Sequence, residues 1–481
     1  MKYRNFAAII TSIGNFDSGP PCVAGRGKAD NGMRDIKYQS GIIDPLNKAL
    51  GKLEAPLAPA EAATGWRLLD EELSLPAAVL YESRLAHNLA WMRRFMDEYG
   101  VKFAPHGKTT MAPKLFARQL EAGAWGITLA TAQQTAAAHA HGVKRVLMAN
   151  QLVGRRNMEI VADLLRDPDF EFFCLVDSAE LVDQLGGFFR ARGQRLQVLL
   201  ELGVEGGRTG VRDAAQQQQV LDALDRWPGA LTLAGVEIYE GVLQQEADIR
   251  AFLRRTVAVT RELAAQGRFG AGAESRPVVL SGAGSAWYDV VAEEFAGADI
   301  GAPIDIVLRP GCYLTHDVGI YRQAQQRILA SNPVARKMRE GLLPALQLWA
   351  YVQSIPEPDR AIVGMGKRDA AFDAGMPIPA RHFRPGSADR GAMDDAKDDA
   401  KGGANARGTA PGDTPSIPSH WEITGMMDQH AYLRIAPGDD VRVGDMIAFD
   451  ISHPCLTFDK WRHIPVLDDE LRVVDIVQTF F

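Results

Sequence analysis

Short apolar runs alternate with helix-sized segments through the middle of the chain. Continuous apolar strands that alternate with helices are typical of a parallel sheet covered on its outside. Eight such units lie between residues 101 and 320, which predicts an α/β fold, a (β/α)8 barrel of the TIM type. An open doubly wound sheet is the alternative, because periodicity alone does not show closure. The predicted strands are residues 101–104, 126–130, 145–148, 170–176, 196–202, 231–239, 277–281 and 304–309.

A helical pattern precedes these strands. Apolar side chains recur on one helical face at Leu85, Leu89, Met92 and Met96. We predict that Ser83 caps the start of this helix and that Gly100 ends it.

The rhythm changes after residue 320, where strand-like runs follow one another without helices. We therefore predict a barrel domain over residues 75–320 and a C-terminal all-β domain over residues 321–481. Residues 1–65 show no sustained periodicity and are predicted to form an N-terminal extension. Residues 387–416 contain no Val, Ile, Leu or aromatic residue, so they cannot offset their ordering entropy by burial, and we predict a disordered insertion there. The predicted β-domain strands are residues 347–354, 360–363, 431–435, 446–451 and 471–477.

Composition narrows the class of protein. The 481 residues include 60 acidic and 53 basic side chains, a formal net charge of −7, which argues against nucleic acid as a partner. No apolar run reaches the roughly 18 residues of a membrane helix, and the start of the chain lacks a signal-peptide cleavage pattern. The four cysteines are scattered, which excludes a disulfide framework and indicates a reducing compartment. These observations predict a cytoplasmic enzyme or binding protein.

Unusual residues follow the predicted barrel strands, where the active site of a TIM-type barrel lies. Lys108 stands in a Pro-His-Gly-Lys-Thr-Thr segment just after the first strand. Burial there would lower its pKa and leave a neutral amine for a Schiff base. The alternative is an ordinary solvated surface lysine. Tyr239 ends the sixth strand and has the alternative of a buried core phenol.

Two loops suit an anionic ligand. A glycine-rich loop over residues 201–210 carries Arg208, although it lacks the phosphate-loop pattern and could be a simple turn. The seventh strand ends in small residues whose backbone N–H groups could form an anion nest. This is also where barrels often bind phosphate, so a phosphorylated cofactor and a lysine are predicted together. The nest comprises Ser281, Gly282, Gly284 and Ser285.

The β domain adds a His-x-Cys pair, His453 and Cys455. Imidazole and thiolate together suit zinc, and two ligands leave room for water and substrate. The alternative is coincidence, since cysteine is commonly a small buried hydrophobe.

These motifs, taken in order, resemble the family that contains D-serine dehydratase and D-threonine aldolase, pyridoxal-phosphate enzymes of the alanine-racemase-like barrel type. The resemblance runs from about residue 75 to the C-terminus. It is carried by Pro-His-Gly-Lys-Thr at 105–109, Gly-Arg-Thr-Gly-Val at 207–211, Tyr-x-Gly at 239–241, Ser-Gly-Ala-Gly-Ser at 281–285, Leu-Arg-Pro-Gly-x-Tyr at 308–313 and His-x-Cys at 453–455.

The resemblance implies a role for each motif. Lys108 would hold pyridoxal phosphate, Arg208 would lie beside the cofactor ring or its phenolic oxygen, and Tyr239 would lie near the pyridine nitrogen. Residues 281–285 would bind the phosphate. His453 and Cys455 would bind zinc near the substrate hydroxyl. Members with His-x-Cys are usually dehydratases and those with His-x-Asp aldolases, so Cys455 favours dehydration. Residues 428–431, Asp-Gln-His-Ala, depart from the family's acidic pair followed by His-Gly.

The expected activity is β-elimination from a 3-hydroxy D-amino acid, with D-serine giving pyruvate and ammonia. An aldolase that cleaves D-threonine is the nearest alternative. A racemase would need a second base opposite Lys108. A non-catalytic pyridoxal-phosphate carrier would generally lack the second domain, and a metal-dependent barrel hydrolase would need more rim ligands than His106 and His316. The resemblance also implies a homodimer acting on a small amino-acid substrate.

Overall fold

The computed structural model describes residues 42–481, apart from 271–275 and 387–416. The predicted disordered insertion and most of the predicted N-terminal extension therefore lie outside the described residues. The described part of the extension is packed, because Ile43, Leu50 and Ala62 are buried. Among the described residues, no helix is long and apolar enough to cross a membrane.

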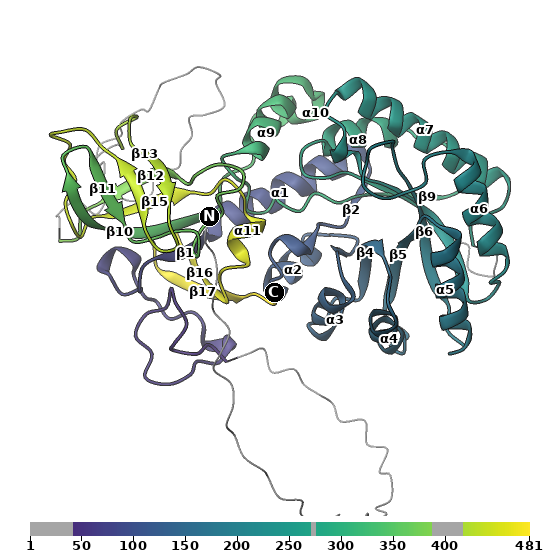
Figure 1. The fold of residues 1–481 in the computed structure, drawn as a ribbon, viewed down its shortest axis with the longest axis horizontal. Helices are drawn as coiled ribbons and strands as arrows, with labels where there is room; N and C mark the ends of the chain where they lie inside the picture. Colours follow the sequence, from purple (N-terminus) through teal and green to yellow (C-terminus); the bar gives the residue numbers. More distant parts are fainter. Residues whose placement is uncertain (1–41, 271–275, 387–416) are drawn as a thin grey trace, which may run out of the picture. The chain divides into compact units, whose positions relative to one another are not determined.

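Eight parallel strands form one curled sheet in the order β2-β9-β8-β7-β6-β5-β4-β3 (Figure 1). Its two outer strands meet, because a parallel bridge joins His106 to Thr128 and the Trp125 N–H donates to the Phe103 carbonyl at 2.8 Å. The predicted barrel and its eight strands are therefore confirmed, and the open sheet is wrong. The strands are β2 (Lys102–Phe103), β3 (Ile127–Leu129), β4 (Arg145–Gln151), β5 (Glu171–Val176), β6 (Leu196–Leu202), β7 (Leu231–Ile238), β8 (Val278–Gly282) and β9 (Ile304–Leu308).

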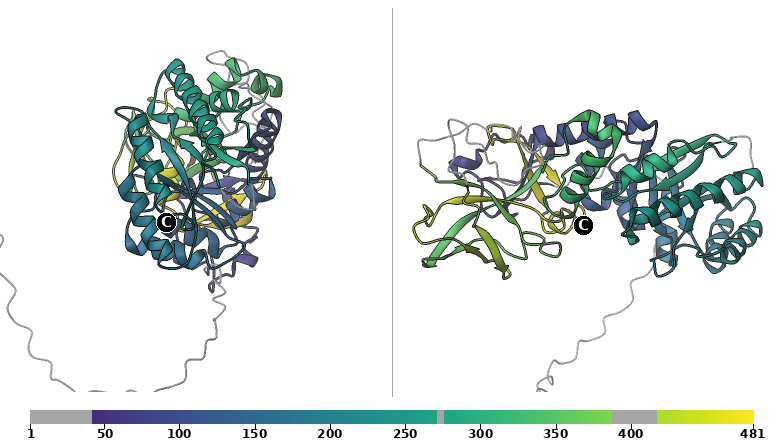
Figure 2. Two further views of the ribbon diagram at one scale, coloured as in Figure 1. Left: turned by 90° about the vertical axis from the view of Figure 1, so that its right-hand side faces the viewer. Right: turned by 90° about the horizontal axis from the view of Figure 1, so that it is seen from above.

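Helices cover the outside of this sheet (Figure 2). The first of them confirms the predicted apolar face and its end at Gly100, whose φ of 64° suits glycine. The predicted cap is wrong: the helix begins at Glu82, and the Ser83 hydroxyl donates to Asp469 instead, at 2.7 Å. The helices are α1 (Glu82–Tyr99), α2 (Pro113–Glu121), α3 (Ala132–Ala140), α4 (Arg155–Leu164), α5 (Ala179–Arg190), α6 (Ala214–Asp225), α7 (Glu246–Ala265), α8 (Tyr288–Phe295), α9 (Ile320–Ser331) and α10 (Pro333–Met338).

A second sheet of nine strands forms the β domain. β1 precedes the barrel in sequence yet lies inside this sheet, antiparallel to β10 and parallel to β16. The Tyr81 hydroxyl fixes the pairing, since it donates to Gln347 Oε1 at 2.5 Å and accepts from Trp349 Nε1 at 3.0 Å. The sequence pattern did not predict β1, β12, β13 or β16. The strands are β1 (Ala77–Tyr81), β10 (Leu346–Glu357), β11 (Arg360–Val363), β12 (Ile378–Phe383), β13 (Glu422–Met426), β14 (Ala431–Arg434), β15 (Met446–Asp450), β16 (His463–Leu467) and β17 (Val473–Gln478).

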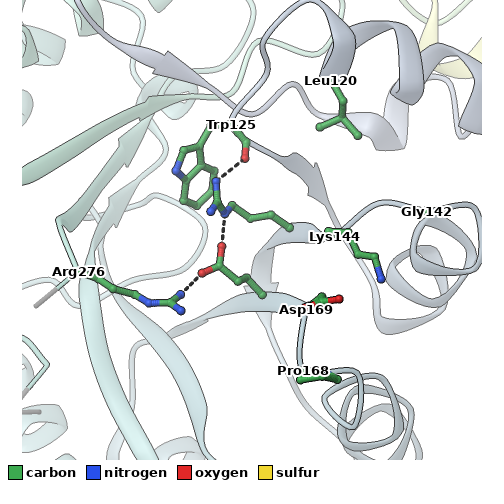
Figure 3. Close-up of a pocket in the computed structure, with 9 residues that line it drawn as sticks. Leu120, Trp125, Gly142, Lys144, Pro168, Asp169 and Arg276 are labelled. Carbon is green, nitrogen blue, oxygen red and sulfur yellow. Dashed lines mark hydrogen bonds and ion pairs between the residues drawn. The ribbon is translucent and has the colours of Figure 1, made fainter. Parts of the chain in front are cut away.

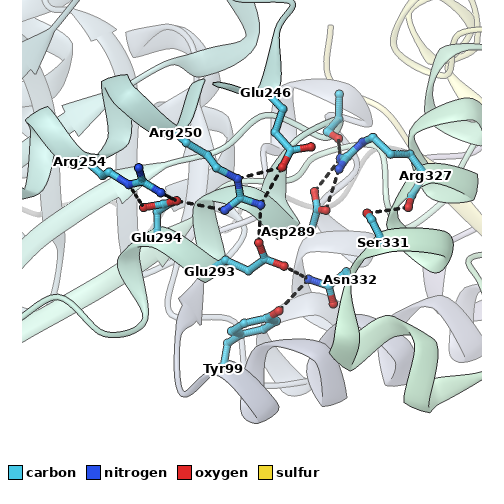
Figure 4. Close-up of polar contacts among 11 residues, drawn as sticks. Tyr99, Glu246, Arg250, Arg254, Asp289, Glu293, Glu294, Arg327, Ser331 and Asn332 are labelled. Carbon is cyan, nitrogen blue, oxygen red and sulfur yellow. Dashed lines mark hydrogen bonds and ion pairs between the residues drawn. The ribbon is translucent and has the colours of Figure 1, made fainter. Parts of the chain in front are cut away.

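A polar network fixes α8, the helix that follows the predicted phosphate loop (Figure 4). Glu293 of α8 pairs with Arg250 of α7 at 2.6 Å and accepts from Asn332 Nδ2 at 2.8 Å. Asn332 caps α10 and also donates to the Tyr99 hydroxyl of α1 at 2.7 Å. Because Asn332 is 1% exposed, these bonds are shielded from water, and they hold α8 against helices from three other parts of the chain.

Candidate active site

Lys108 lies in a short 3-10 helix, η3 (Gly107–Thr109), that follows the carboxyl end of β2. Its side chain is accessible from the barrel mouth. Desolvation by the surrounding protein is the largest effect on its pKa and lowers it; Cys455 opposes this effect and Arg208 adds to it. A lysine in this setting supplies more neutral amine at neutral pH than a solvated one, as a nucleophile requires.

The His-x-Cys pair of the β domain meets this loop. Cys455 begins a short helix, α11 (Cys455–Phe458), and its thiol lies 3.4 Å from the Thr109 hydroxyl, one residue beyond Lys108. A second thiol, Cys312 after β9, lies 3.7 Å from Cys455 Sγ and 3.9 Å from Thr109 Oγ1. The fold therefore brings the predicted lysine and the predicted metal ligands to one place from opposite ends of the chain.

The charges in this cluster are unusual. A hydrogen bond from Cys312 is the main cause that lowers the pKa of Cys455, to about 4, and His453 contributes further. The Cys455 thiolate in turn raises the pKa of His453 to about 9, with help from Asp373, whose carboxylate lies 2.7 Å from His453 Nδ1. Cys455 is thus a thiolate across the neutral range, the form that binds metals.

Two residues that the sequence did not single out as catalytic or ligating lie beside the thiols. Tyr321 forms a hydrogen bond with Cys312, and the electrostatic effect of Cys312, then burial and the charge of Cys455, raise the pKa of the phenol far above its usual value. Asp317 is 2% exposed and accepts from the N–H groups of Gly319 and Tyr321 at 2.8 and 3.2 Å. Burial raises the pKa of Asp317 to about 6. Its place just after the Arg-Pro-Gly motif is the one sequence signal that could have indicated it.

Arg208 and Tyr239 stack on one another, with the guanidinium carbon 4.4 Å from the centre of the phenol ring. Desolvation and then the charge of Glu240 raise the pKa of Tyr239, so the phenol keeps its proton. Gly241 lets the ring fold back, because a Cβ there would lie 2.4 Å from the Tyr239 hydroxyl oxygen. These two predicted cofactor contacts therefore act as one unit.

The predicted anion nest follows β8, but its residues have different partners. The Ser281 hydroxyl donates to the Val307 carbonyl at 3.0 Å inside the barrel, and Gly282 is part of β8. The Gly284 N–H donates to Glu240 at 2.7 Å. The Ser285 hydroxyl oxygen accepts from the N–H groups of residues 311 and 312, both at 3.0 Å. Ser285 thus links the nest to the loop that carries the second thiol.

A buried ion pair, Glu237 with Arg309, lies inside the barrel near these groups. Arg309 also donates to the Ile238 carbonyl at 2.8 Å. Three buried polar atoms of this region have no partner among the described residues: His106 Nδ1, Glu237 Oε2 and Arg309 Nε. Unpaired buried polar atoms are costly and rare in folded proteins, so their concentration here marks a place for a polar ligand.

Other predicted or visible features lie elsewhere. Asp428 and His430 stand in the exposed turn between β13 and β14, and His316 is buried. A hollow of about 540 Å³ opens at the amino ends of β4 and β5, the barrel end opposite Lys108 (Figure 3). Its wall is tied by Arg145, which stacks 4.7 Å above Trp125 and pairs with Glu171. This arrangement braces the end of the barrel that carries none of the predicted chemistry.

Comparison with known families gives two matches along the chain. The model described as "Alanine racemase, N-terminal domain" matches residues 81–295, and the model described as "Putative serine dehydratase domain" matches residues 345–467. The first covers the barrel as far as α8, without β9, and the second covers most of the β domain with His453 and Cys455.

Two curated relatives are similar in sequence. D-threo-3-hydroxyaspartate dehydratase of Delftia sp. (strain HT23) is 32% identical over 171 residues, 35% of this chain and 44% of that enzyme. This match therefore spans less than half of the relative's length. D-threonine aldolase of Arthrobacter sp is 26% identical over 304 residues, 63% of this chain and 74% of that enzyme.

Solved structures share the fold. A D-threonine aldolase from Filomicrobium marinum superposes with a TM-score of 0.67 at 21% identity, covering 88% of this chain and 98% of that chain. The Delftia sp. HT23 dehydratase gives 0.64 at 21% identity, covering 86% and 99%. Variants of that dehydratase replace a histidine, or a cysteine two positions later, by alanine, and the cysteine variant is described as being in the metal-free form.

Proposed function

The chain belongs to the family of D-serine dehydratase and D-threonine aldolase, and we propose that it is a pyridoxal-phosphate- and zinc-dependent dehydratase of a 3-hydroxy D-amino acid. One observation carries the proposal. The Cys455 thiolate of the β domain lies 3.4 Å from Thr109, the neighbour of Lys108, so a metal donor and a reactive amine share one mouth. D-serine is the first substrate to test.

The residues present fit pyridoxal phosphate. Three buried polar atoms have no hydrogen-bond partner among the described residues: His106 Nδ1, Glu237 Oε2 and Arg309 Nε. The pKa of Lys108 is lowered, as suits an amine that forms a bond with a carbonyl carbon. Lys108 would hold the cofactor, with Arg208 and Tyr239 beside its ring. When bound, the cofactor supplies an electron sink for a carbanion at the substrate α-carbon.

The residues also fit a zinc ion with two protein donors. In the described part of the chain, no group of three or more His, Cys, Asp or Glu side chains is arranged to hold a metal, so the proposed site has two protein ligands. His453 and Cys455 supply one imidazole and one thiolate. Asp373 occupies His453 Nδ1 and leaves Nε2 for the metal, an orientation typical of histidine ligands. Zinc held there would supply Lewis-acid stabilisation of the departing β-hydroxide.

Lys108 and Tyr239 have different roles in the proposed reaction. Lys108, once its amine is free, is placed to accept the α-proton as a general base. Tyr239, a phenol that keeps its proton, presents no full negative charge to the cofactor ring. Loss of the α-proton and of the β-hydroxide from D-serine leaves an enamine, which hydrolyses to pyruvate and ammonia.

Retro-aldol cleavage is the second candidate, supported by the aldolase relative that aligns with 63% of the chain. It would remove the β-hydroxyl proton and break the Cα–Cβ bond. Cys455 favours dehydration, because the aldolases usually carry aspartate at this position.

A product screen separates the two. Purified protein loaded with pyridoxal phosphate and zinc is incubated with D-serine, D-threonine, D-threo-3-hydroxyaspartate and the L-forms. We expect ammonia with pyruvate from D-serine, or with oxaloacetate from the hydroxyaspartate. Glycine with acetaldehyde from D-threonine, and no ammonia from any substrate, would contradict dehydration.

Cys455→Ala tests the metal donor, with Cys174→Ala, a buried cysteine of β5, as its control.

A further inference from the structure

Glu240 is a buried acidic residue that the proposed chemistry does not use. It follows Tyr239 at the carboxyl end of β7 and begins η4 (Glu240–Val242). Its carboxylate accepts two backbone hydrogen bonds, from the Ala283 N–H at 3.1 Å and from the Gly284 N–H at 2.7 Å. Both donors belong to the loop in which the sequence predicts phosphate binding.

The carboxylate lies beneath this loop rather than in the barrel mouth. Glu240 is 0% exposed. By comparison, Arg208 and Lys108, which line the mouth, are exposed. A carboxylate that filled the phosphate's own place would share that exposure.

The loop needs such support. Ala283 has a φ of 78°, a left-handed conformation that an L-residue with a Cβ adopts at a cost. The two bonds to one carboxylate fix consecutive N–H groups in the concave arrangement of an anion nest. Gly284 also packs closely there, since a Cβ would lie 3.2 Å from the Tyr239 ring and 3.6 Å from Glu240 Oε1. Without the carboxylate, the backbone at 283–284 would be free to relax.

We infer that Glu240 is a positioning residue for cofactor phosphate: it binds the loop at Ala283 and Gly284 from beneath and so presents the backbone from Ser285 onward to the phosphate group. The inference rests on the proposed use of pyridoxal phosphate. It assigns the two N–H groups at 283 and 284 to the protein itself. The phosphate then depends on the backbone and hydroxyl groups that follow them.

The test compares two ligands that differ only in the phosphate. Cofactor-free wild type, Glu240→Gln and Glu240→Ala are titrated with pyridoxal phosphate and with pyridoxal, and binding is followed by absorbance. Glutamine keeps the shape but presents an N–H2 group to one of the two donors. We expect the Kd for pyridoxal phosphate to rise about tenfold or more, the usual effect of losing a charged hydrogen bond, and the Kd for pyridoxal to change less than about twofold. Glu262→Gln, on the exposed face of α7, is the control and should change neither.

Each other result overturns the inference. Equal weakening for both ligands would mean that Glu240 only supports the fold. Tighter binding of pyridoxal phosphate would mean that the carboxylate occupies the phosphate's place. A wild type that binds neither ligand would overturn the proposed function as well, so the two failures are distinguishable.

A measurement on the unmutated protein covers the case in which the variants do not fold. Amide hydrogen exchange is followed at residues 283–286 with and without pyridoxal phosphate. We expect the amides of Ala283 and Gly284 to be protected before the cofactor is added, and the amides from Ser285 onward to gain protection with it. Rapid exchange at 283 and 284 in the cofactor-free protein would contradict the inference.

Discussion

The charge state of individual side chains in the barrel mouth decides what the site can do. Lys108 has a lowered pKa because it is desolvated, while Cys455 is held as a thiolate by a neighbouring thiol and by His453. A base and a metal donor that are both active near neutral pH suit elimination from an amino acid.

Replacement of Lys108 should remove both cofactor attachment and catalysis. We expect Lys108→Ala to lose the visible absorption band that borohydride fixes in wild type, and to lower kcat by at least about 10³-fold, because base and attachment point are lost together. The control is Lys52→Ala, which replaces an exposed lysine that precedes the barrel in sequence. A borohydride-fixed band that persists in Lys108→Ala would exclude Lys108 as the attachment residue.

Metal dependence should follow Cys455. A chelator should abolish dehydration, and added zinc should restore it. Cys455→Ala should bind zinc about 10-fold to 100-fold less tightly than wild type, or fail to retain it. Metal content by mass spectrometry and activity are measured on the same samples. Full retention of zinc and rate in Cys455→Ala would refute its role as a ligand.

Glu237 predicts a pH dependence of stability. Burial raises its pKa to about 7, whereas an unfolded chain releases this proton near pH 4.5. Between these values the folded protein holds a proton that the unfolded chain has lost, so Glu237 contributes fully to stability below about pH 4.5, and this contribution disappears as the pH rises through about 7. Relative to Glu237→Gln, cofactor-free wild type should lose up to about 3 kcal/mol of unfolding free energy between about pH 5 and pH 8. Urea unfolding at each pH measures this; parallel curves for the two proteins would show that Glu237 does not titrate there.

The sequence offers candidate site residues where a local motif carries them. Lys108, Arg208, Tyr239 and the His-x-Cys pair stand in short ordered segments, and the structure brings these segments together. Glu240 and Tyr321 could not be singled out in this way. Glu240 contacts Ala283, 43 residues later, and Tyr321 contacts Cys312, nine residues earlier. The spacing of residues within a motif does not reveal such contacts.

At the scale of elements, two loops touch at the centre of the site. The loop after β9 packs against η3, because a Cβ on Gly311 would lie 2.8 Å from Thr109 Oγ1 and 2.9 Å from the His106 carbonyl oxygen. This close approach holds Lys108 and Cys312 in one geometry.

Substitution of this glycine should therefore disturb the site more than the fold. We expect Gly311→Ala to cost about 1–3 kcal/mol of stability through overpacking and to weaken pyridoxal phosphate binding at least about tenfold. Gly297→Ala, where nothing lies within 4 Å of the added Cβ, is the matched control. Thermal unfolding and cofactor titration measure the two effects, and unchanged cofactor affinity would show that the loops adapt independently.

Elements of the barrel were predictable because each strand is a continuous apolar run followed by a helix. The second sheet was harder. β12 contains Pro379 and Arg381 within its six residues, so its pattern is not that of a regular strand. β1 is apolar throughout, but its partners β10 and β16 lie hundreds of residues later, and periodicity carries no information about distant pairing.

For the whole molecule, the apolar surface around the mouth bears on assembly. Ile320, Phe372 and Leu456 are each at least 40% exposed, and they neighbour Tyr321, Asp373 and Cys455 in sequence. Exposed apolar side chains beside a functional site are candidates for a protein interface. The family resemblance predicts a homodimer, and these side chains are candidates for its interface.

We therefore expect a dimer in solution by light scattering, and expect Phe372→Asp to shift it toward monomer with lower activity, because a charge would be buried in the interface. Val443→Asp, an equally apolar and 64% exposed position of the β domain, is the control and should remain dimeric. A monomeric wild type at micromolar concentration would contradict the prediction.

The position of β1 has a consequence during synthesis. The ribosome makes this strand before the barrel, and β10 follows roughly 260 residues later. Translation proceeds at about 5–20 residues per second, so β1 remains without its neighbouring strands for on the order of tens of seconds. Its sequence is Ala-Ala-Val-Leu-Tyr, and all five residues are buried in the folded protein. The barrel can be complete by then, tethered to an unsatisfied strand. Nascent chains of this protein should therefore be clients for chaperones that bind short apolar segments, until the second sheet emerges and takes β1 into its centre.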